Sequence, residues 1–294
     1  PIIDAAGFPD KTSATHSGAR MSLPPCPPDP YCLAENACAA ITQAVAAAGI
    51  CQTDLTPADL VELDEFHLGG AAATLKLVAQ FDLPENAKLL DIGAGLGGPA
   101  RLIAQNHSYY VHGVDITPGF VAAAEMLSDW TGFTTRTSFS IGDATALPFA
   151  AESFDGAYSF HLGMNIANKA ALCAEAYRLL KPGGTFLSYD ILQGPGGEVL
   201  YPTPWADLAA QSYVVSPEVM EQHLTGAGFE ILTRIDRTAE NLAWMQSLVQ
   251  RPKEHRPKLT LATVMGPDFI EKSRMQMRNL KEGRIQTIAY LCRK

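Results

Sequence analysis

From residue 88 onward, short apolar runs alternate with longer segments in which apolar residues recur at helical spacing. The short runs predict buried strands, and the longer segments predict helices. Strands that alternate with helices are typical of a parallel sheet with helices on both faces. The expected strands cover residues 88–92, 109–116, 137–143, 154–160, 184–192, 229–238 and 284–293.

Helices are expected between these strands and ahead of the first one. An alanine-rich segment ends at Gly49, and the pair Thr56-Pro57 is typical of a helix start. The predicted helices cover residues 34–49, 58–66, 98–107, 118–132 and 168–184.

Four segments fall outside this alternation. Residues 1–20 precede Met21 and are expected to be an extension, and the proline-rich residues 22–31 a linker. Residues 193–215 and 239–283 interrupt the strand pattern and are natural places for a lid, because binding residues concentrate on loops held by a rigid sheet. We therefore expect an N-terminal extension and helix in 1–55 and one domain with lid insertions in 56–294.

Composition narrows the classes of partner. The 294 residues carry a net charge of −9 and no basic stripe, which argues against a nucleic-acid partner. No apolar run approaches the length of a membrane span, and no signal peptide is recognisable, so the cytosol is the expected compartment. The six cysteines show no zinc-type spacing, so free thiols and no metal site are expected.

The stretch LLDIGAGLGGPAR, residues 89–101, holds the first candidate chemistry. Gly93, Gly95 and Gly98 fit the G-x-G-x-x-G pattern of a dinucleotide-binding turn. Asp91 precedes them, and its charge would repel a pyrophosphate at close range. A ligand with cationic groups, such as S-adenosylmethionine with its ammonium and sulfonium, suits this acid better.

Three later features support an adenosine-containing ligand. Asp115 ends the second strand about 20 residues past the glycines, where an acid holds ribose hydroxyls in nucleotide sites. Asp143 follows the third strand, where a carboxylate accepts a hydrogen bond from an adenine amine. The segment LLKPGGTF, residues 179–186, predicts a helix stop and a tight turn into a strand.

The ordered set LLDIGAGLGG, GVDIT, GDATALPF, FDGAYS and LLKPGGTF resembles class I S-adenosylmethionine-dependent methyltransferases, including the ubiquinone and menaquinone biosynthesis enzymes. The segments DEFHLGG and KEGRIQTIAYLCRK are similar to sarcosine and dimethylglycine N-methyltransferases. The resemblance covers roughly residues 60–238. It implies a Rossmann-like α/β fold with a seven-stranded, mostly parallel sheet whose last strand is antiparallel.

The resemblance also implies which residues meet the cofactor. Asp91, Gly93 and Gly95 would surround the methionine moiety, and Gly97 would let the next helix start close by. Asp115, with Ile116 beside it, would hold the ribose. Asp143 and Ala144 would hold the adenine.

The acceptor is expected beyond the carboxyl ends of the strands. His161 and Asn165 follow the fourth strand, and His67 lies in EFHLGG; each is a candidate for orienting the acceptor or moving its proton. For both histidines, a packing role is the alternative.

Three aromatic residues, Tyr201, Trp205 and Tyr213, occur in the 193–215 insertion. Their faces would hold a cationic amine by cation–π attraction. The alternative is that they only anchor the loop.

The sequence thus predicts methyl transfer to a small molecule, with an amine nitrogen slightly favoured. Methylation of oxygen or carbon, as in a quinone precursor or secondary metabolite, stays open, as do a non-catalytic cofactor-binding subunit and an NAD-dependent dehydrogenase. The assembly also stays open, with a homodimer among the alternatives.

Overall fold

The computed structural model describes residue 31 and residues 34–294. The predicted extension (1–20) and the predicted linker (22–31) lie outside the described residues, except for Tyr31. Cys26 and Cys32 also lie outside them. Within them, seven strands form one sheet in the order β3-β2-β1-β4-β5-β7-β6. The strands are β1 (Lys88–Ile92), β2 (Tyr110–Asp115), β3 (Thr137–Ile141), β4 (Phe154–Phe160), β5 (Leu180–Gln193), β6 (Glu230–Asp236) and β7 (Ile285–Arg293).

The sheet confirms the predicted topology. β1 pairs in parallel with β2 and with β4, and β4 pairs in parallel with β5. The last strand, β7, is antiparallel to both β5 and β6. The strand order reverses between β1 and β4, which makes their carboxyl ends a topological switch point where ligands bind in open α/β sheets.

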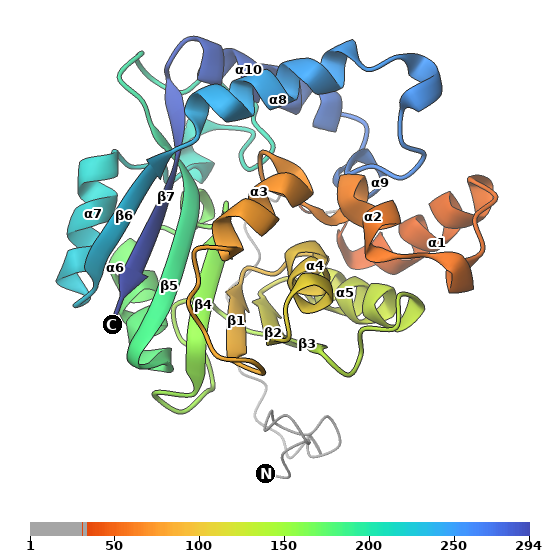
Figure 1. The fold of residues 1–294 in the computed structure, drawn as a ribbon. Coiled ribbons are helices and arrows are strands. Elements are labelled where there is room, and N and C mark those ends of the chain that lie inside the picture. Colours follow the sequence, from red (N-terminus) through yellow and green to blue (C-terminus); the bar gives the residue numbers. More distant parts are fainter. Residues whose placement is uncertain (1–30, 32–33) are drawn as a thin grey trace, which may run out of the picture.

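Helices cover both faces of the sheet, as Figure 1 shows. The alternation of side chains along β1 sends Leu89 into a core formed with one set of helices and Leu90 into the opposite core. The first set comprises α3 (Gly70–Val78), α4 (Gly98–Asn106) and α5 (Pro118–Trp130); the second comprises α6 (Lys169–Leu179) and α7 (Pro217–Gly226).

The segment predicted as a second lid is largely helical. It contains α8 (Thr238–Gln250), α9 (Ala262–Met265) and α10 (Phe269–Lys281). In Figure 1, α8 and α10 lie across the top of the molecule, and α9 lies below them. The 193–215 insertion is mostly irregular, with one short 3₁₀ helix at Ala209–Gln211. None of the described helices combines the length and apolar character needed to cross a membrane.

Two local predictions are wrong. β5 begins at Leu180, so residues 180–184 are strand rather than the end of a helix; Leu180 pairs with Phe154 ahead of a bulge. Helix α3 was not predicted, because Gly69 and Gly70 at its start are poor helix formers. Tertiary packing stabilises α3, since Ala73 and Leu77 are fully buried.

The N-terminal helix α1 (Ala37–Ala47) packs on the main domain. Ile41 and Val45 share a hydrophobic core with Phe120 and Leu127 of α5. This packing depends on Gly119 of α5, because the backbone at Ala34 lies close to it. A Cβ atom on residue 119 would lie 1.9 Å from the Ala34 carbonyl oxygen.

We expect Gly119→Ala to displace this N-terminal segment from α5 and to lower the free energy of unfolding by about 1–3 kcal/mol, the usual range for overpacking. Hydrogen exchange in 37–47 should accelerate. Gly226→Ala is the matched control, because its Cβ would meet nothing within 4 Å; alanine there should be neutral or stabilising. Equal exchange in both variants would show that the segment does not depend on this contact.

Candidate functional site

The turn after β1 holds its glycines in conformations that other residues rarely adopt. The φ angles of Gly93, Gly95 and Gly97 are +84°, +52° and +73°, in the left-handed region that favours glycine. A Cβ atom on Gly93 would lie 2.9 Å from Leu162 Cδ1, and one on Gly95 would lie 2.8 Å from Phe66 Cδ2. The backbone conformation therefore favours glycine at these two positions, and a larger residue would also have to displace Leu162 or Phe66.

Asp115 ties this turn to the end of β2. Its Oδ2 accepts a hydrogen bond from the Gly95 N–H at 2.9 Å, and its Oδ1 accepts one from the Thr117 N–H at 2.9 Å. Burial raises the pKa of Asp115, and these hydrogen bonds oppose the rise. Each carboxylate oxygen has a further lone pair for a ligand hydroxyl.

Asp91 lies behind the turn rather than on the wall of the cavity described below. Its side chain is 2% exposed, and its Oδ2 has no hydrogen-bond partner among the described residues. Burial raises the pKa of this carboxyl to about 8, and the nearby Tyr158 hydroxyl partly opposes the rise. A buried acid of this kind ionises readily only when a cation approaches.

A second acid at the site, Glu65, was missed by the sequence analysis. Its side chain lines the cavity, is 4% exposed, and leaves Oε1 without a hydrogen-bond partner among the described residues. Burial and the neighbouring Asp64 raise the pKa of Glu65 well above its ordinary value, with a smaller contribution from Asp91. Asp64 itself is neutralised by Arg101, whose guanidinium lies 2.7 Å away. The site therefore holds more buried acid than it holds cation.

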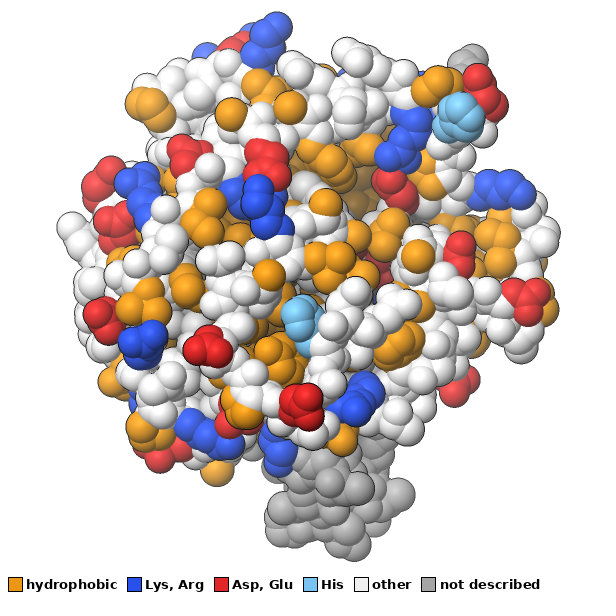
Figure 2. All heavy atoms as spheres, in the orientation of Figure 1, with side chains coloured by type: hydrophobic (Ala, Val, Ile, Leu, Met, Phe, Trp, Pro, Cys, Tyr) orange, Lys and Arg blue, Asp and Glu red, His pale blue; other side chains and the backbone are white. Residues whose placement is uncertain are grey.

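A cavity of about 660 Å³ opens at the carboxyl ends of the strands, within the usual size range of ligand pockets. Figure 2 shows the face hollowed beneath α8, with hydrophobic side chains inside the hollow. The lining comes from the glycine turn, the end of β2, the segments 61–68 and 160–166, the 193–215 insertion, α8, α9 and α10. The helical segment predicted as a lid thus forms one wall.

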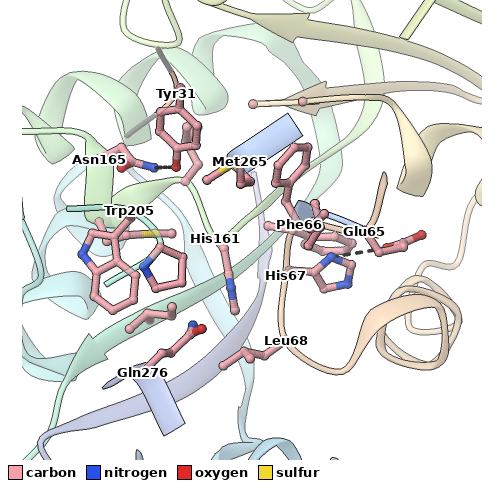
Figure 3. A pocket seen from close by; sticks show the side chains of 18 of the residues that line it. Tyr31, Glu65, Phe66, His67, Leu68, His161, Asn165, Trp205, Met265 and Gln276 are labelled. Carbon is pink, nitrogen blue, oxygen red and sulfur yellow. Dashed lines mark hydrogen bonds and ion pairs between the residues drawn. The ribbon is translucent and has the colours of Figure 1, made fainter. Parts of the chain in front are cut away.

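His161 lies near the middle of the cavity in Figure 3. Its backbone has φ +51°, a left-handed conformation that His adopts more readily than most residues, and its N–H donates to the Tyr189 carbonyl oxygen at 2.7 Å. The ring is buried and packs on Tyr189 at 4.8 Å, but Nε2 has no partner among the described residues. Burial, with help from His67, holds the pKa well below its ordinary value, so the ring is neutral and its free nitrogen can accept a hydrogen bond.

His67 also lines the cavity but is held by protein groups. Its Nδ1 lies 3.3 Å from Glu65 Oε2, and its Nε2 lies 3.1 Å from the Thr74 hydroxyl. Burial lowers its pKa to about 3, with a smaller contribution from Arg237. Both ring nitrogens have partners, so His67 fits the packing alternative better than His161 does (Figure 3).

Asn165 lies on the cavity wall and donates from Nδ2 to the Tyr31 hydroxyl at 3.3 Å. Figure 3 shows this contact above His161. Tyr31 was not predicted as a site residue, because it closes a proline-rich run that carries no other signal. The contact joins the chain ahead of α1 to the loop after β4.

The three aromatic residues of the insertion lie in different places. Trp205 and Tyr213 line the cavity, whereas Tyr201 does not. Trp205 is 2% exposed, and its Nε1 donates to Ser212 Oγ at 2.9 Å; Tyr201 packs in the same hydrophobic cluster. Trp205 therefore forms a fixed wall.

The other predicted cofactor residues also differ in position. Ile116 lines the cavity, but Gly97, Asp143 and Ala144 do not. The Asp143 Oδ1 accepts from the Thr145 N–H at 2.8 Å and from its hydroxyl at 2.7 Å, which holds the loop after β3. Gly97 lets α4 begin, because a Cβ there would lie 2.5 Å from Phe139.

Comparisons with known proteins agree with this geometry. Residues 90–188 match the family described as a methyltransferase domain. A phosphoethanolamine N-methyltransferase from Triticum aestivum is 31% identical over 183 residues, which is 60% of this chain and 35% of that protein. The chain thus spans about a third of the length of this curated relative.

Two solved structures share the fold. The phosphoethanolamine N-methyltransferase 2 of Haemonchus contortus, in complex with phosphomonomethylethanolamine and S-adenosylhomocysteine, superposes with a TM-score of 0.66 at 20% identity, over 86% of this chain and 60% of that one. The [4+2]-cyclase SpnF superposes with a TM-score of 0.62 at 23% identity, over 76% and 81%.

Proposed function

We propose that this chain, whose residues 90–188 match the methyltransferase-domain family, transfers a methyl group from S-adenosylmethionine to an amine nitrogen of a small molecule. The observation that carries the proposal is the pairing of two features at the switch point. One is a glycine turn backed by the buried acid Asp91; the other is an apolar cavity that holds His161. Asp91 Oδ2 and His161 Nε2 both lack a hydrogen-bond partner among the described residues.

The residues at the turn fit S-adenosylmethionine. Asp91 supplies a buried carboxyl whose Oδ2 has no hydrogen-bond partner among the described residues, which suits a cationic group. Gly93 and Gly95 keep the wall free of side chains, and Asp115 presents a carboxylate where ribose hydroxyls are held in related folds. When bound, the cofactor supplies an electrophilic methyl group on its sulfonium.

The chain's own residues would then align the acceptor and remove water. The cap formed by α8 and α10 and the Trp205 wall enclose the cavity. Alignment and exclusion of solvent are worth up to about 7–11 kcal/mol of an intermolecular barrier. His161 Nε2 would accept a hydrogen bond from an N–H of the neutral acceptor amine and so orient its lone pair toward the methyl group, because the ring is neutral and that nitrogen is free.

The test is methyl transfer from labelled S-adenosylmethionine to matched panels of small amines, alcohols and quinols, with products identified by mass. We expect label on amine nitrogen. Label confined to oxygen or carbon would overturn the choice of nitrogen, and cofactor binding without any labelled product, also in cell extract, would identify a non-catalytic binding subunit. A cytoplasmic location and a homodimeric assembly belong to the same proposal and are tested by fractionation and by sedimentation.

A further inference from the structure

We infer that the acceptor is an amine on an apolar body that carries no phosphate or carboxylate group. This inference rests on the proposed function and concerns the part of the cavity between His161 and the helical cap. It sets the chain apart from the Haemonchus contortus structure, which was solved with a phosphorylated amine.

The cavity lining has no cationic side chain. Among the described residues that line it there is no Lys and no Arg, whereas Glu62, Glu65 and Asp115 are present. A phosphate needs charge-assisted hydrogen bonds, usually from Arg or Lys, to replace its hydration. An anionic acceptor would instead enter a cavity whose charged groups are all acids.

The basic side chains near this region are engaged elsewhere. Arg251 pairs with the cavity-lining Glu62 at 2.8 Å, so this cation is already matched by an acid. Lys169 donates to the carbonyl oxygens of Gly163 and Ile166 and holds the loop after β4. Arg101 is buried and pairs with the buried Asp64 at 2.7 Å, and the buried Arg237 pairs with the half-exposed Glu240 at 2.9 Å.

Apolar side chains form the cap side of the cavity. Trp205 and Met245 are buried there, and Leu248 and Phe269 line the same wall from α8 and α10. An apolar body gains free energy by leaving water for such a wall. Figure 3 shows Trp205 and Gln276 beside His161, which places the wall next to the free ring nitrogen.

Few polar groups interrupt this apolar surface. Gln276 is 6% exposed and lines the cavity from α10, and His161 Nε2 is buried without a partner among the described residues. Both groups are uncharged, since the pKa of His161 lies well below its ordinary value because of burial. They suit an amine head group, while the acids favour a positive charge over a negative one.

The experiment compares tyramine with its O-phosphate, together with phosphoethanolamine and a series of alkylamines. Binding of S-adenosylhomocysteine is measured first, because its absence would count against the proposed function itself. Calorimetry with each amine is done on the protein loaded with S-adenosylhomocysteine, and methyl transfer to each amine is measured separately with S-adenosylmethionine as the donor. We expect tyramine or an alkylamine to bind and react at least about tenfold better than either phosphorylated amine.

A cation introduced into the wall should reverse this preference. Ser273 lines the cavity from α10, and its hydroxyl bonds only to the Phe269 carbonyl oxygen of the preceding turn. In Ser273→Arg we expect the affinity for tyramine phosphate to rise about tenfold and that for tyramine to fall. Gln250→Arg, at an exposed position on α8, adds the same charge outside the cavity and should change neither.

A preference for phosphorylated amines in the unaltered protein would overturn the inference and leave the proposed function standing. Failure of every apolar amine to bind the protein loaded with S-adenosylhomocysteine would overturn it as well.

Discussion

Asp91→Asn should melt at a higher temperature than the unaltered protein and should bind S-adenosylhomocysteine at least about tenfold more weakly. The first effect arises because the Asp91 carboxyl is buried and its Oδ2 lacks a partner among the described residues. The second arises because the same carboxyl is the charge that we expect to meet the ligand's ammonium. A hydrogen bond to a charged group is worth about 1.5–3 kcal/mol, which corresponds to roughly tenfold to a hundredfold in affinity.

The stability difference should depend on pH in a defined direction. Burial raises the pKa of Asp91 in the folded protein to about 8, whereas an unfolded Asp has a pKa of about 3.9. The folded state therefore holds a proton that the unfolded state has lost, and stability falls as the pH rises from about 4 to about 8. Asparagine has no proton to lose, so the advantage of Asp91→Asn should grow across this range.

The measurements are thermal melts between pH 5 and pH 8 and calorimetric titrations with S-adenosylhomocysteine at pH 8. Each additional 1 kcal/mol in the free energy of unfolding should raise the melting temperature by about 2–4 °C in a protein of this size. Asp129→Asn, at an exposed position on α5, removes the same charge away from the turn and should leave both quantities unchanged. A variant that is stabilised yet binds normally would remove Asp91 from the cofactor site.

His161→Asn should lower kcat by about tenfold to a hundredfold, because the hydrogen bond that orients the acceptor amine is worth about 1.5–3 kcal/mol where charge develops on the nitrogen, and should leave S-adenosylhomocysteine binding within about threefold. Asparagine tolerates the positive φ of this position, so the substitution removes the imidazole without straining the backbone. Because burial holds the pKa of His161 well below 6.5, the loss of rate should be the same from pH 6.5 to pH 8.

The same burial affects stability on the acid side. Below pH 6.5 an unfolded His gains a proton that the folded His161 does not take up. The free energy of unfolding should therefore decrease as the pH is lowered in the unaltered protein, and decrease less in His161→Asn. His255→Asn, at an exposed position, is the matched control for rate and stability. Unchanged turnover by folded His161→Asn would assign the ring to packing alone.

The strands that meet at the switch point were predictable from sequence because their signals are local. The apolar runs at 88–92 and 154–160 coincide with β1 and β4. The spacing of the glycines after β1 predicts a tight turn, because only glycine fits such a turn without steric strain. The antiparallel last strand was implied by the family resemblance, and the long excursion before residue 284 agreed with it.

The cavity wall was harder to predict because it depends on contacts between distant segments. In the sequence, Glu65 is one of several charged residues in a predicted amphipathic helix. Only the folded structure buries it close to Asp91 as well as to its neighbour Asp64. Tyr31 meets Asn165 across 134 residues of sequence. The absence of Lys and Arg among the described lining residues is likewise a property of the assembled cavity.

Titration of the unaltered protein with S-adenosylhomocysteine at pH 8, in parallel with NADH, tests the central claim most directly. The account predicts saturable binding of S-adenosylhomocysteine at one site per chain and no binding of NADH, because the buried acids at the glycine turn favour a cation over a pyrophosphate. Binding of NADH in place of S-adenosylhomocysteine, or no binding of either ligand, would contradict it.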